Sequence, residues 1–220
     1  MIMTLATLAV LAVQDKDPGS TKEAMKRVQF LVGEWKATWT PEGKEGWEEL
    51  QSWEYKIDKE EYALQYTVKD GKLHKSGLLS YDLKKKVYRL ELVHMNDKKS
   101  AFEGKLSGKE LVLEPAGDEK GPQEKISYNF LRDNRFIGDT QRRDAGAKLW
   151  SASASIQYTK QGVPFVRSEA PKCIVTGGTG SIEVAYGGKT YYVCCNSCKK
   201  EFLAEPAKTL ETAKKEGWLK

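Results

Sequence analysis

Short runs of alternating apolar and polar residues limit what this chain of 220 residues can fold into more than any other feature. Side chains of a β-strand point in turn to its two faces, so such a run predicts a strand with one buried and one solvent-facing side. Trp35, Ala37 and Trp39 show the pattern first. It recurs in later runs at Tyr62–Val68, Tyr88–Leu92, Ile126–Phe130 and Trp150–Tyr158.

Turn-forming dipeptides separate these runs, and no helical pattern lies between them. Examples are Asp70-Gly71, Asn96-Asp97 and Asp133-Asn134. Regularly spaced strands joined by tight turns predict an antiparallel meander, and closure into a barrel is the simplest way to remove its exposed edges. We therefore expect a mainly β chain with a lipocalin-like barrel of about ten strands. Ser20 and Glu23 form a capping box that predicts one short helix before it.

The segment from about residue 30 to residue 160 resembles a family of bacterial lipocalin-like barrels of unassigned function. The resemblance rests on the motifs Phe30–Trp35, Gly77–Asp82 and Tyr158–Lys160. A more distant resemblance, through the opening Gly-x-Trp theme, is to the haem-binding nitrobindin barrels. These motifs imply a fold and specify no chemistry.

The first residues differ from the rest of the chain. Thr4–Val13 is uninterrupted and apolar, and a polar segment follows it. About twenty residues are needed to cross a bilayer, so we expect a signal peptide and leader over residues 1–19 and a periplasmic or secreted protein. An N-terminal helix packed on the fold is the alternative. The expected layout continues with the barrel at 20–160, a linker at 161–171 and a small module at 172–220.

All four cysteines lie in that last module. Cys173 is followed, after twenty residues, by Cys194, and three further residues precede Cys198. Two alternating strands joined by Gly187-Gly188 predict a hairpin that carries the chain back toward Cys173, with a small helix starting near Cys198. Asn196 and Ser197 are the expected cap residues, and Pro206 and Gly217 bound a second helix. Thiolates bind zinc, cuprous copper and other soft metals, and a helix N-terminus favours the thiolate form.

The module resembles the TRASH/YHS domains, which are small metal-binding modules of heavy-metal sensors, transporters and metallochaperones. The resemblance rests on Cys173–Gly177, the strands around Tyr186–Tyr192, the Cys194-x3-Cys198 pair and the following Lys199–Phe202 and Glu205-Pro206. It implies that Cys173, Cys194 and Cys198 are the ligands of a transition metal, with zinc or copper the expected ions. The name-giving histidine is not evident, and Cys195 follows Cys194. Cys195, water or a partner's ligand would be the fourth ligand of tetrahedral zinc.

The rival interpretation is a carrier barrel for a small hydrophobic ligand or haem, in which disulfides among the cysteines only stabilise the structure. His94 shares a strand face with Leu90 and Leu92, so we expect it inside the barrel, where an imidazole could bind haem. A core histidine bonded to a hydroxyl is the more common case, so haem is not expected. His74, between Lys72 and Lys75, is expected to be exposed.

Several functional classes find no support in the sequence. The net charge of +5 is spread over interleaved lysines and acids, so nucleic-acid binding is not expected, and neither is stable insertion into a membrane. No G-x-S-x-G motif occurs, and we expect no enzyme. Gly177–Gly180 is glycine-rich like a phosphate loop, but it precedes a strand and lacks the following Lys-Ser/Thr, so it predicts a turn. The expected role is sensing, buffering or transfer of a metal, with a metal transporter or another exported protein as partner.

Overall fold

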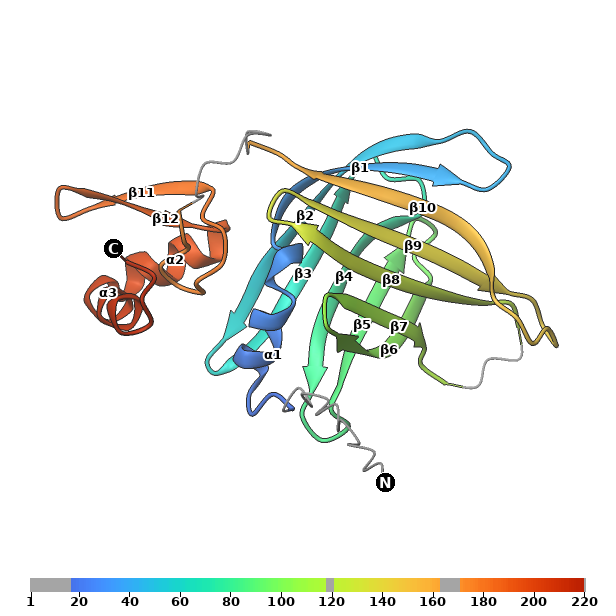
Figure 1. Cartoon of the computed structure of the whole chain (residues 1–220), viewed down its shortest axis with the longest axis horizontal. Helices are drawn as coiled ribbons and strands as arrows, with labels where there is room; N and C mark the ends of the chain where they lie inside the picture. Colours follow the sequence, from blue (N-terminus) through green and yellow to red (C-terminus); the bar gives the residue numbers. More distant parts are fainter. Residues whose placement is uncertain (1–16, 118–120, 163–170, 220) are drawn as a thin grey trace, which may run out of the picture.

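A closed antiparallel barrel forms most of the computed structural model, which describes residues 17–117, 121–162 and 171–219 (Figure 1). Each strand pairs with its neighbour in sequence, and the last pairs with the first. The predicted meander, barrel closure and strand number are confirmed. The strands are β1 (Gly33–Pro41), β2 (Trp47–Asp58), β3 (Glu61–Lys69), β4 (His74–Asp82), β5 (Val87–His94), β6 (Lys99–Ser107), β7 (Glu110–Pro115), β8 (Gln123–Arg132), β9 (Arg135–Arg143) and β10 (Ser151–Lys160).

Aromatic side chains fill the centre of the barrel. The rings of Phe136 and Tyr158 stack with centroids 4.0 Å apart, and Trp35 meets Phe136 edge-on at 4.6 Å. Trp53 and Tyr66 pack against each other from β2 and β3 at 4.7 Å. All five are buried, as the period-two pattern of their strands requires. These rings fill the middle of the barrel, and a pocket of about 640 Å³ lined by Trp39, Trp47 and Thr140 lies toward the far end of β1.

A short helix lies against the barrel beside β3 and β4. It is α1 (Thr21–Arg27), and a 3-10 turn, η1 (Gln29–Leu31), connects it to β1. The Ser20 hydroxyl accepts a hydrogen bond from the Glu23 N–H at 3.1 Å, so the predicted N-cap is confirmed. Met25 of this helix is fully buried. The Tyr88 hydroxyl donates to the Ala24 carbonyl at 2.9 Å and ties the helix to β5.

The C-terminal module consists of a two-stranded hairpin and two helices. These are β11 (Ile182–Tyr186), β12 (Lys189–Val193), α2 (Asn196–Ala204) and α3 (Pro206–Lys215). The hairpin has the predicted strands and the predicted Gly187-Gly188 turn. The predicted start of α2 was wrong, because the helix begins at Asn196 with Cys195 as its N-cap. Neither Asn196 nor Ser197 therefore caps it, and Cys198 lies within its first turn.

The module packs on the barrel through α2 and β2 (Figure 1). The Tyr62 hydroxyl, at the start of β3, lies 3.3 Å from a Glu201 carboxylate oxygen on α2. The barrel thus covers the face of the module that carries the start of α2. Most of the expected signal peptide (1–16) and linker (163–170) lies outside the described residues. Within the described ranges, no helix has the length and apolar character that a bilayer-spanning helix needs.

The two histidines lie beside each other on β4 and β5. The prediction that His74 is exposed was wrong, because only 7% of its surface is accessible. His74 on β4 pairs with His94 on β5, and the centroids of the two imidazole rings are 5.0 Å apart. His94 is half-buried, and its Nε2 lies 2.7 Å from the Ser100 hydroxyl, as expected of a core histidine with a hydroxyl partner. The lysines misled the prediction, since Lys75 faces the opposite side of β4 and Lys72 lies before the strand begins.

Candidate metal centre

Three separate elements bring the predicted metal ligands together. Cys173 stands in the loop before β11, Cys194 directly follows β12, and Cys198 lies in the first turn of α2. The Ile174 N–H donates to the Tyr192 carbonyl at 3.0 Å, which fixes the Cys173 loop against β12. The hairpin therefore returns the chain to Cys173, as its spacing predicted.

A tight turn holds Cys173 in place. The Gly177 N–H donates to the Cys173 carbonyl at 2.8 Å, and Gly177 has a φ of +75°. A Cβ at this position would lie 2.5 Å from the indole ring of Trp218. Only glycine combines this backbone conformation with so close a contact. The residue that looked like part of a phosphate loop in the sequence thus shapes the cysteine loop.

The three sulfurs form one compact cluster. The Sγ atoms of Cys173, Cys194 and Cys198 all lie within 4.8 Å of one another, and those of Cys194 and Cys198 are 3.5 Å apart. The three side chains are 0%, 4% and 0% exposed. Sulfurs bound to one zinc ion at about 2.3 Å in tetrahedral geometry stand about 3.8 Å apart. The cluster therefore matches the size of a thiolate metal site.

All four cysteines are free thiols, so the disulfides of the rival interpretation do not form. The sulfurs instead contact one another and a hydroxyl, since the Thr176 Oγ1 lies 3.7 Å from the Cys194 Sγ. Thr176 is buried with them. This arrangement leaves the thiols available as ligands.

Hydrogen bonding within the cluster divides the protons unequally. Burial acts to raise the pKa of the Cys173 thiol, but hydrogen bonds from Cys194 and Cys198 hold it well below its usual value. The same contacts with Cys173 raise the pKa of Cys194 and of Cys198 well above the usual value. Among the three sulfurs, these shifts favour the thiolate at Cys173 and the thiol at Cys194 and Cys198. A metal ion that binds all three sulfurs must displace the remaining protons.

Cys195, the fourth predicted ligand, contacts Cys194 and Cys198 but is not part of the three-sulfur cluster. Its sulfur is not among the atoms that lie within 4.8 Å of one another in the described part of the chain. Contacts with the Cys194 and Cys198 side chains lower its pKa, and the backbone N–H groups of Cys198 and Tyr55 act in the same direction. Cys195 therefore lies beside two of the ligands, on the side of the module that faces β2.

Two barrel residues near the cluster were missed in the sequence. Tyr55 of β2 is buried, its hydroxyl has no hydrogen-bond partner in the described structure, and burial, followed by the nearby Cys194, raises its pKa well above the usual value. Lys160, the last residue of β10, is only 5% exposed, and its Nζ donates to the Val32 carbonyl at 2.9 Å. Burial lowers the pKa of Lys160, and Cys194 and Asp133 oppose this shift. The alternation of Ile156, Tyr158 and Lys160 was the signal for an inward lysine.

His94 does not belong to this cluster. Its strand partner His74 packs on Trp39, whose ring centroid is 6.5 Å from that of His74. Trp39 lies near the end of β1, whereas Gly33 at the start of β1 is next to Lys160. The histidine pair thus lies near the end of β1, whereas Lys160 and the cysteines lie near its start.

Comparisons with known proteins leave the family open. No protein-family model matches the sequence, and no curated protein is significantly similar to it. One similar solved structure is that of a protein of unknown function from the DUF3598 family of Nostoc punctiforme, with 10% identity and a TM-score of 0.37. The match covers 60% of this chain and 48% of the other, so the chain spans about half the length of that protein. Similarity at this level carries no functional inference, and the TRASH/YHS resemblance stays a prediction.

Proposed function

We propose that this chain is a non-enzymatic protein that binds a soft transition metal through Cys173, Cys194 and Cys198. The observation that carries the proposal is the convergence of three buried, free sulfurs within 4.8 Å of one another. Packing of a small apolar core alone does not explain why three thiols from three separate elements converge. Thiolate clusters of this kind select zinc and cuprous copper over harder ions.

The surroundings of the cluster suit either ion. Three thiolates suffice for a three-coordinate cuprous ion, whereas zinc needs a fourth ligand from Cys195, water or a partner. A thiolate complex of either ion carries negative charge, which is costly to bury without a compensating cation. The buried ammonium group of Lys160 supplies positive charge from the barrel, and the pKa of Lys160 responds to Cys194. We therefore include Lys160 in the proposed site as an electrostatic partner and not as a ligand.

The biological role we propose is sensing, buffering or transfer of the metal in the periplasm or outside the cell, with a metal transporter or another exported protein as partner. The TRASH/YHS resemblance and the apolar N-terminal segment support this setting. The rival carrier function has lost its disulfides.

Metal analysis of the reduced full-length protein tests the proposal. We expect about one zinc or copper ion per chain, and loss of that ion in Cys194→Ser, because two thiolates hold a soft ion far less tightly than three. Cys195→Ser tests whether this neighbouring thiol, which contacts Cys194 and Cys198, is the fourth ligand. Absence of tight binding by the reduced wild-type protein would overturn the proposal. Equal loss in both variants would instead make Cys195 a ligand.

A further inference from the structure

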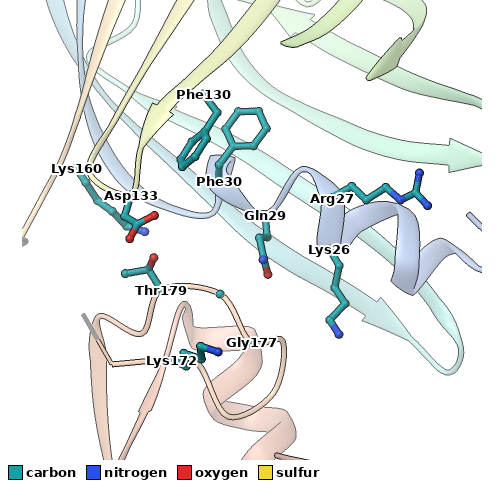
Figure 2. Close-up of a pocket in the computed structure, with 11 residues that line it drawn as sticks. Lys26, Arg27, Gln29, Phe30, Phe130, Asp133, Lys160, Lys172, Gly177 and Thr179 are labelled. Carbon is teal, nitrogen blue, oxygen red and sulfur yellow. The ribbon is translucent and has the colours of Figure 1, made fainter. Parts of the chain in front are cut away.

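A pocket of about 330 Å³ lies between the barrel and the module, away from the three sulfurs (Figure 2). Its barrel side comes from α1, η1 and the ends of β8 and β10, and its module side from Lys172 and the loop Gly177–Thr179. Pockets of this size commonly hold small molecules. The proposed metal site shares Lys160 with this pocket and leaves the rest of the lining unused.

Basic side chains dominate the lining. Lys26, Lys160 and Lys172 line the pocket together with Arg27, which pairs with Glu23, and Asp133 is the one acid among its lining residues. An excess of positive charge in a concave site attracts anions and concentrates them there. The pocket therefore favours a negatively charged ligand.

Lys160 gives this pocket a fixed cation. Its side chain is almost completely buried, passes over the Trp35 ring at 5.2 Å and donates to the Val32 carbonyl. An ammonium group carries three donors, so this bond leaves capacity for a ligand. The nearby Asp133 favours the charged form of Lys160, against the effect of burial. A buried and anchored ammonium group loses little entropy on binding an anion, unlike a mobile surface lysine.

The loop on the module side adds neutral donors. The Cys173 N–H donates to the Gly178 carbonyl at 2.6 Å, and the Gly180 N–H donates to the Pro171 carbonyl at 2.7 Å. These two bonds bracket Thr179 and do not use its N–H. Figure 2 shows the Thr179 hydroxyl directed across the pocket toward Asp133 and Lys160. A hydroxyl and cations that face the same space are typical partners of a phosphate or carboxylate group.

One wall of the pocket is apolar. The Phe30 and Phe130 rings lie with centroids 5.4 Å apart, and both line the pocket on its barrel side (Figure 2). A free inorganic ion would make no use of this wall. A ligand with an apolar or aromatic body would cover the two rings while its charged end reached the lysines.

We propose that this pocket binds a small organic oxyanion, with a phosphate or carboxylate head group on an apolar body. Lys160, Lys172 and Thr179 bind the head group, and Phe30 and Phe130 contact the body. Asp133 offers an acceptor for a hydroxyl hydrogen of the ligand. The pocket shares Lys160 with the proposed metal site, but none of the three sulfurs lines it, and the binding of an anion there is measured without a metal.

Isothermal titration of the full-length protein with phenyl phosphate tests this site. We expect saturable binding that weakens with added salt, and a loss of about tenfold in affinity in Lys172→Ala, because one charged hydrogen-bonding group is removed. Thr179→Val should also weaken binding. Lys98→Ala is the matched control, since it removes the same charge from an exposed turn outside the pocket. Lys160→Met completes the series, with circular dichroism to check its fold.

Three further probes identify the head group. Binding of phenyl phosphate over benzoate assigns a phosphate, and the reverse preference assigns a carboxylate. If inorganic phosphate binds as tightly as phenyl phosphate, the two phenylalanines do not contribute to binding, and the proposal of an organic ligand is overturned. Absence of binding by both aromatic anions would overturn the proposal. The proposal would also be overturned if Lys172→Ala and Thr179→Val bound phenyl phosphate as tightly as the wild-type protein does. Binding of neutral benzyl alcohol with the same affinity as phenyl phosphate would overturn it too.

Discussion

Mild acid should destabilise the barrel through one buried imidazole. Burial, with a smaller contribution from His94, lowers the pKa of His74 from 6.5 to about 4. The unfolded chain therefore binds a proton at a higher pH than the folded chain does. The stability that comes from neutral His74 is fully present above about pH 6.5 and is lost as the pH falls toward about 4. Each pKa unit corresponds to about 1.4 kcal/mol, so the complete loss is about 3 kcal/mol.

Urea unfolding followed by tryptophan fluorescence measures this effect. Between neutral pH and about pH 5 we expect the wild-type free energy of unfolding to fall by about 2 kcal/mol from His74. His74→Phe keeps a ring beside Trp39 and removes the titrating group, so its stability should fall by about 2 kcal/mol less over the same range. His94→Gln is the control and should keep most of the acid sensitivity, because burial is the main cause of the shift. The reasoning is refuted if His74→Phe loses as much stability as the wild-type protein.

Two further expectations concern the cysteine cluster and its barrel contact. Metal affinity should rise with pH by up to about a hundredfold per pH unit, because binding displaces protons from Cys194 and Cys198, whose pKa values are raised. Competition with a chromophoric chelator measures this slope. An affinity that does not change with pH would contradict the predicted protonation of the two thiols. Gly33→Ala should cost about 2 kcal/mol or more in urea unfolding, because Gly33 has a φ of +129° and a Cβ would lie 2.6 Å from Lys160 Cε. Gly43→Ala, with a positive φ and open space around it, should cost less.

Local patterns in the sequence were enough to predict the barrel and the hairpin. Period two and turn dipeptides are properties of neighbouring residues, and they predict the hairpin of β11 and β12 with its Gly187-Gly188 turn. The cysteine spacing likewise predicts which sulfurs meet. The exposure of His74 and the start of α2 were predicted wrongly, because each was inferred from residue type. Flanking lysines made His74 look exposed, and cysteine was not considered as an N-cap.

The pocket beside the barrel was beyond the reach of the sequence. Its lining residues come from α1, two barrel strands and the glycine loop, which lie far apart in the chain. Only the packing of the module on the barrel brings them together, and no local pattern encodes that packing. Lys160 is the exception, since the alternation of β10 points it inward. Lysine is so rarely buried that residue type outweighed this signal.

The burial of the three sulfurs also bears on the kinetics of exchange. A competing thiol must touch an ion to take it by ligand exchange, and side chains at most 4% exposed offer no such approach. If the chain holds the proposed ion, separation of α2 from β2, with rupture of the contact between Tyr62 and Glu201, would open a route for its release. The residence time of the metal would accordingly follow the opening rate of this interface more than the strength of the metal–sulfur bonds. A recipient protein that grips the module and pulls it from the barrel would act as a catalyst of release.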